Sequence, residues 1–196
     1  MPIKKSELYS SLWASCDALR GGMDASQYKD FVLTMLFIKY VSDKYAGKPF
    51  APIEVPEGAS FDAVVALKGQ KDIGDKINTI IGKLADENPQ LKGVINIADF
   101  NDPNLLGQGK EMVDRLSNLV AIFENPALDF STNRAEDDDL LGDAYEYLMR
   151  NFAVQSGKSK GQFLTPAEVS RVIAQVVGIR HAERQDQTLH DPTCGS

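Results

Sequence analysis

The feature that most constrains the fold is a wide apolar stripe at helical spacing between residues 26 and 45. Its members are Tyr28, Phe31, Val32, Met35, Leu36 and Ile38. They recur at intervals of three and four residues, which is the period of an α-helix. A stripe this wide indicates a helix that is buried on more than one side within a bundle. We therefore assign these side chains to a core and not to a ligand site.

Similar stripes predict further helices on both sides of the first one. They cover about residues 6–19, with Ser6 as the N-cap, 73–86, 112–123 and 141–152. Three prolines between Gly47 and Gly58 break helical structure and predict an extended loop there. The apolar run Val94–Ile97 is compatible with a short strand, and the structure of residues 47–72 and 91–109 is otherwise left open.

A well-marked helix start lies at residues 165–168. Thr165 suits the N-cap, Pro166 suits the first helical position, and Glu168 completes a capping box. Four apolar residues then share one stripe and the helix is expected to stop at Gly178. The stripe consists of Val169, Val172, Ile173 and Val176.

The chain continues from that helix into a short extended stretch at Thr188–His190, followed by the turn Asp191-Pro192-Thr193-Cys194-Gly195-Ser196. A strand that opens into a glycine-bearing turn is typical of sites that bind nucleotide-like cofactors, because glycine lets backbone N–H groups approach the ligand. A plain capped helix with a small turn is the alternative interpretation of these two segments. Their order along the chain favours the cofactor site.

Three segments in this order carry a family resemblance. They are Leu141-Gly142-Asp143-Ala144-Tyr145-Glu146-Tyr147-Leu148 with Asn151-Phe152-Ala153, then Gly161-Gln162-Phe163-Leu164-Thr165-Pro166, then Asp191–Ser196. The helical start from Leu12-Trp13 to Asp43 adds to it. The chain resembles the adenine-specific DNA methyltransferases of the amino family, and most closely the modification (M) subunit of type I restriction–modification systems.

The resemblance implies a mainly α fold. Residues 1–153 would form an N-terminal helical bundle that serves as a partner or DNA-clamp module. Residues 154–196 would begin a Rossmann-like methyltransferase domain, cut within its cofactor loop. The boundary falls near residues 153–160, where Gly, Ser and Lys interrupt the apolar pattern.

The resemblance also implies S-adenosylmethionine as cofactor. Asp191 would accept a hydrogen bond from its amino end, and the amides near Gly195 and Ser196 would face its carboxylate. Gln162, Phe163, Thr165 and Pro166 would line the methionine or adenine side. The complete set of cofactor-binding residues would be Gly161, Gln162, Phe163, Leu164, Thr165, Pro166, Asp191, Pro192, Cys194, Gly195 and Ser196.

Two departures from the family pattern limit the activity expected of this stretch alone. Leu164 stands where the family often has an aromatic residue. An Asn-Pro-Pro-aromatic or Asp-Pro-Pro-aromatic motif, which in the family holds the flipped adenine, does not occur in the sequence. We therefore assign no catalytic residue and expect the stretch itself to be inactive, to bind S-adenosylmethionine poorly, and to have a poorly ordered tail.

The composition and net charge of the chain limit the classes of protein to which it can belong. With 43% apolar and 25% charged residues the chain is typical of a globular protein. Its net charge of −7 disfavours an autonomous DNA-binding module, since such modules need clustered Lys and Arg. By resemblance, the partners would be a specificity subunit, a second M subunit and a restriction subunit, with DNA bound as part of the complex.

The short apolar runs predict no membrane span, and the N-terminus has no apolar signal region, which favours the cytoplasm. Cys16 and Cys194 with the two histidines lack ligand spacing, so we predict neither a disulfide nor a metal site. The acidic run at residues 136–139 suits the start of the next helix.

The alternative to the methyltransferase is a non-catalytic helical interaction module. A dinucleotide-binding oxidoreductase fits the Asp191–Ser196 turn less well.

Overall fold

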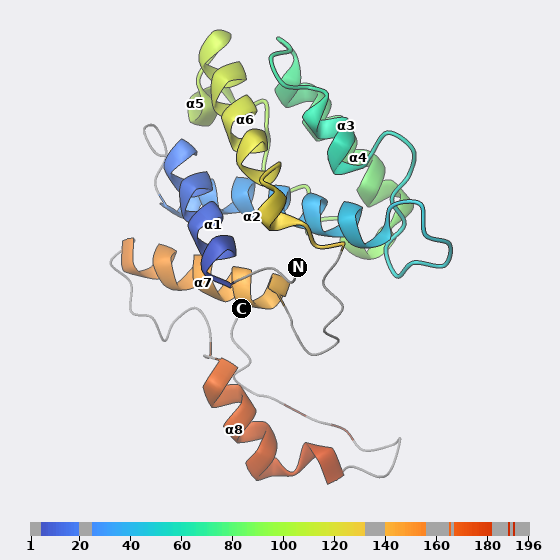
Figure 1. The fold of residues 1–196 in the computed structure, drawn as a ribbon, viewed down its shortest axis with the longest axis vertical. Coiled ribbons are helices and arrows are strands. Elements are labelled where there is room, and N and C mark those ends of the chain that lie inside the picture. Colours follow the sequence, from blue (N-terminus) through green and yellow to red (C-terminus); the bar gives the residue numbers. More distant parts are fainter. Residues whose placement is uncertain are drawn as a thin grey trace. The chain divides into compact units, whose positions relative to one another are not determined.

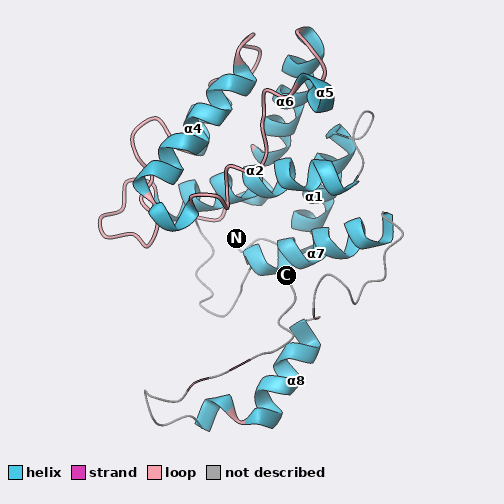
Figure 2. Ribbon diagram, turned by 180° about the vertical axis from the view of Figure 1, so that it is seen from behind, coloured by secondary structure: helices cyan, strands magenta, loops and turns pink. Residues whose placement is uncertain are grey.

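A computed structural model describes residues 5–19, 25–131, 140–155 and 167–181, together with Thr165, Thr188 and His190. Every regular element within these ranges is helical, so the predicted mainly α fold is confirmed (Figures 1 and 2). The chain forms two compact units, Met1–Tyr145 and Glu146–Ser196. The predicted domain boundary at residues 153 and 154 stays a prediction.

Three long helices form the centre of the first unit: α1 (Lys5–Leu19), α2 (Ala25–Tyr45) and α6 (Lys110–Phe123). Each contacts the other two. The whole predicted stripe of α2 is buried, as are the apolar stripes of its two neighbours. The residues that meet in this core include Leu8, Leu12, Phe31, Met35, Leu116 and Leu119. Apolar burial of this kind is the main stabilisation of a helical domain.

The other elements of this unit lie around these three helices. They are α3 (Phe61–Val65), α4 (Ile73–Glu87), the 3-10 turns η1 (Pro89–Leu91) and η2 (Pro126–Leu128), and α5 (Pro103–Leu106). The helix predicted over residues 73–86 is confirmed as α4, and its isoleucines pack inward. Side chains cap the shortest helices: Ser60 accepts from the Ala63 N–H, and Asp102 accepts from the Asn104 N–H.

Polar side chains in the last turns of α2 hold two distant segments. Lys39 Nζ donates to Asp43 Oδ1 at 2.9 Å, while Asp43 Oδ2 accepts the Phe130 N–H at 3.0 Å. Ser42 Oγ accepts the Phe61 N–H at 2.7 Å, at the start of α3. Because these bonds satisfy backbone groups that no helix or strand satisfies, they fix where α3 begins and where the segment after η2 lies.

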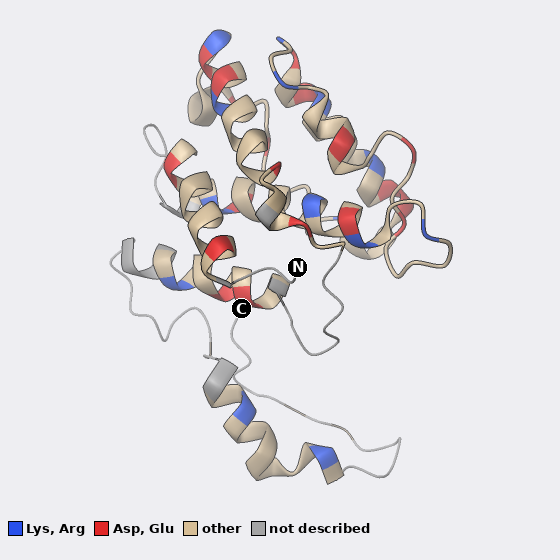
Figure 3. Ribbon diagram, viewed as in Figure 1, with Lys and Arg blue, Asp and Glu red and all other residues tan. Residues whose placement is uncertain are grey.

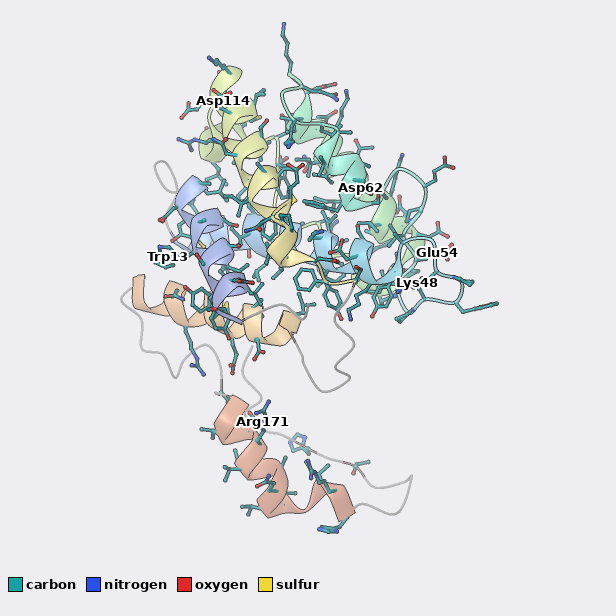
Figure 4. The ribbon with its side chains drawn as sticks, in the orientation of Figure 1. Trp13, Lys48, Glu54, Asp62, Asp114 and Arg171 are labelled. Atoms are coloured by element: carbon teal, nitrogen blue, oxygen red, sulfur yellow. The ribbon has the colours of Figure 1, made fainter. Side chains whose placement is uncertain are left out.

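Asn88 fixes the loop between α2 and α3 in the same way, by hydrogen bonds to its backbone. Its side chain is buried and makes three hydrogen bonds of 2.8 Å. It accepts the Glu54 N–H and donates to the carbonyl oxygens of Glu54 and Leu84. The loop predicted between Gly47 and Gly58 is confirmed. Its Glu54, labelled in Figure 4, is the residue that bonds Asn88 at the end of α4.

We expect Asn88→Ala to lower the free energy of unfolding by about 2 kcal/mol, because it removes these bonds and leaves the Leu84 and Glu54 groups unsatisfied. Chemical denaturation measures this. Asn96→Ala is the matched control, since Asn96 accepts one exposed bond from the Gly93 N–H. Equal losses in the two variants would contradict the anchoring role of Asn88.

Two local predictions are wrong. Residues 94–97 form the end of a turn and an irregular loop, not a strand. The Val94 and Ile95 N–H groups both bond the Leu91 carbonyl, and Gly93 turns the chain at φ +77°. These local bonds satisfy the backbone without a neighbouring strand. Ser6 is not an N-cap, because α1 already includes Lys5.

The remaining helices are α7 (Leu140–Gln155), α8 (Ala167–Val177) and the 3-10 turn η4 (Ile179–His181). The helices predicted from Leu141 and after Thr165 are therefore confirmed. Gly178 follows α8 at φ +74°, the left-handed conformation expected of the residue that ends a helix. The acidic run at residues 136–139 lies outside the described residues.

Candidate functional site

Of the eleven residues predicted to bind the cofactor, the structure describes one. Thr165 is exposed and lies just before the first turn of α8. This position is compatible with both of its predicted roles, helix capping and backbone contact with a cofactor. The other ten lie outside the described residues: Gly161, Gln162, Phe163, Leu164, Pro166, Asp191, Pro192, Cys194, Gly195 and Ser196. So does the tail whose order was predicted to be poor.

The helix that follows Thr165 has a strongly one-sided surface. Its predicted stripe is exposed along its whole length, with Val176 at 81% exposure and Val172 at 58%. Arg171, which is labelled on α8 in Figure 4, is placed by the helical period on the side opposite this stripe. Such a helix is typical of an element that covers a sheet or another helix.

The described part of the chain holds no group of three His, Cys, Asp or Glu side chains that could bind a metal ion. Cys16 is buried in α1, and Cys194 belongs to the undescribed turn. None of the described helices is both long enough and apolar enough to cross a bilayer.

Acidic and basic side chains are interspersed along α2, α4 and α6 (Figure 3). Several oppositely charged neighbours pair one helical turn apart, as Lys76 does with Asp72 and Arg115 with Glu111. Exposed pairs of this kind contribute little to stability. Their consequence is electrostatic: the described faces of these helices lack a continuous cationic stripe of the kind that follows a phosphate backbone.

The pKa values of Asp30 and Asp129 are shifted in opposite directions. Burial raises the pKa of Asp30 above its ordinary 3.8, and the charge of Lys29 opposes part of this shift. Hydrogen bonds from the Ser131 hydroxyl and N–H lower the pKa of Asp129. A carboxyl group whose pKa is higher in the folded state stabilises the fold at pH values below its unfolded-state pKa, and this stabilisation is lost as the pH rises through its folded-state pKa. A carboxyl group whose pKa is lower in the folded state stabilises the fold at pH values above its unfolded-state pKa, and this stabilisation is lost as the pH falls through its folded-state pKa.

We therefore expect Asp30→Asn to raise the melting temperature at pH 7, where ionisation of Asp30 destabilises the fold. The gain in the free energy of unfolding should be less than about 1 kcal/mol, because the group is partly solvated. The gain should disappear below about pH 4, where Asp30 is itself neutral. Asp129→Asn is the control, and we expect it to lower the melting temperature at pH 7. Thermal melts across pH 3–7 measure both; a gain from Asp30→Asn that persists at pH 3 would contradict the assignment.

Two residues of structural interest escaped the sequence interpretation. Asn88 could have been suspected as the residue before Pro89 at a helix end, although its bond to a loop 34 residues away depends on tertiary packing. Phe50 lies between Pro49 and Pro52 in the loop after α2 and is fully exposed. The sequence signal that could have identified Phe50 is its position in a proline-rich loop, outside any apolar stripe.

Comparison with known families divides the chain into two consecutive matches. The family model of the HsdM N-terminal domain matches residues 8–123. The family model of the N-6 DNA methylase matches residues 136–196.

Individual relatives agree with this division. The chain is 29% identical to the type I restriction enzyme MjaVIII methylase subunit of Methanocaldococcus jannaschii, over 99% of the chain and 34% of that protein. It is 23% identical to the MpnII methylase subunit of Mycoplasma pneumoniae, over 98% of the chain and 43% of that protein. The chain thus spans between a third and a half of the length of these relatives.

The fold is similar to the crystal structure of the type I restriction-modification system methyltransferase subunit from Streptococcus thermophilus. The TM-score is 0.72 at 22% sequence identity, and the match covers 91% of this chain and 45% of that one. At 22% sequence identity, this structural similarity supports the assignment of the fold alone.

Proposed function

Because this chain belongs to the HsdM N-terminal domain family, we propose that it is the helical domain and the beginning of the catalytic domain of a type I methylation subunit. The whole protein would transfer a methyl group to the exocyclic amino group of adenine in DNA. Residues 1–153 would be the helical domain and residues 154–196 the start of the methyltransferase domain.

The observation that carries the proposal is the order of the two family matches. A helical domain of this family is followed, after a short gap, by a segment typical of N-6 DNA methylases. The rival non-catalytic interaction module accounts for the helices but not for the second match. The exposed apolar stripe of α8 also favours the methyltransferase, because helices that flank a parallel sheet carry such stripes.

We propose S-adenosylmethionine as the methyl donor; its sulfonium supplies a methyl group with a good leaving group, and the protein mainly positions the reactants. Asp191 would hold the donor's amino end, and the Gly195 and Ser196 amides would face its carboxylate. The segment Gly161–Pro166 would line the methionine or adenine side. Because adenine is buried in the duplex stack, it must flip out to reach such a site.

The proposed partners are a specificity subunit, a second methylation subunit and a restriction subunit. The interspersed charges of the described helices and the net charge of −7 suit a protein that holds DNA together with partners better than one that binds DNA alone.

The test is methyl transfer by the full-length protein mixed with its specificity subunit, using labelled S-adenosylmethionine and duplex DNA that contains adenine. We expect label in the DNA, at the N6 position of adenine, only when both subunits are present. Absence of incorporation at any protein ratio would overturn the methyltransferase assignment and favour the interaction module.

A further inference from the structure

We draw no further inference here: the strongest candidate, the exposed apolar face of α8 formed by Val169, Val172, Ile173 and Val176, restates the proposed function, because the sheet of a methyltransferase domain is its expected cover and nothing in the structure shows another.

Discussion

Gly74→Ala should lower the free energy of unfolding by about 3 kcal/mol, near the upper end for overpacked cores, and the melting temperature by about 10 °C. Gly74 lies in the first turn of α4, where a Cβ would collide with the carbonyl oxygen of Phe100 and lie 3.1 Å from the Cα of Asn101. Both obstacles are backbone atoms, which cannot rotate away as a side chain would.

The Phe100 segment is held on its other sides as well. Its N–H donates to Asn78 Oδ1 at 2.9 Å, and its buried ring packs edge-on against Phe31 with centroids 5.1 Å apart. Relief of the Gly74→Ala collision would therefore disturb the core of α2. We expect the loss to appear as an early, cooperative thermal transition.

Gly82→Ala on the same helix is the matched control. A Cβ at Gly82 would meet nothing within 4 Å. Because alanine loses less backbone entropy than glycine in a helix, this variant should gain about 0.5–1 kcal/mol. The two substitutions are chemically identical, so opposite signs in denaturant melts would isolate the contact with Phe100. Equal effects would show that α4 does not approach residues 100 and 101 as described.

Asp191→Ala should weaken S-adenosylmethionine binding to the full-length protein by about 100-fold, and methyl transfer with it. On the proposed function Asp191 accepts a hydrogen bond from the ammonium group of the methyl donor. Hydrogen bonds to charged groups contribute about 1.5–3 kcal/mol, which corresponds to about 10- to 150-fold in affinity. Calorimetric titration measures the loss directly.

Two variants make the Asp191 result specific. Asp191→Asn keeps a hydrogen-bond acceptor without the charge and should lie between the wild type and Asp191→Ala. Asp186→Ala removes a carboxylate five residues away, outside the predicted motif, and should bind as the wild type does. If Asp186→Ala weakens binding as much as Asp191→Ala, the effect is a general loss of negative charge and the assignment of Asp191 is wrong.

The helices were predictable because their signals are local. The apolar stripes of α2, α4 and α6 repeat with the helical period. The end of α8 was predictable because Gly178, as a glycine, can adopt the positive φ of +74° that ends the helix. The prediction of a strand at residues 94–97 was wrong because apolar content alone does not distinguish a strand from a turn. The positive φ of Gly93 and the hydrogen bonds to the Leu91 carbonyl stabilise the turn.

Sequence order alone determined which family this chain resembles and where its helices lie, since motif order and periodicity are properties of the linear chain. Tertiary structure alone decided which polar side chains hold distant backbone groups, such as Asn88 at Glu54 and Asp43 at Phe130. It alone revealed why Gly74 excludes a methyl group; the reason lies in the approach of α4 to the backbone of Phe100 and Asn101. These features depend on distances between residues far apart in the chain, and no local pattern encodes such distances.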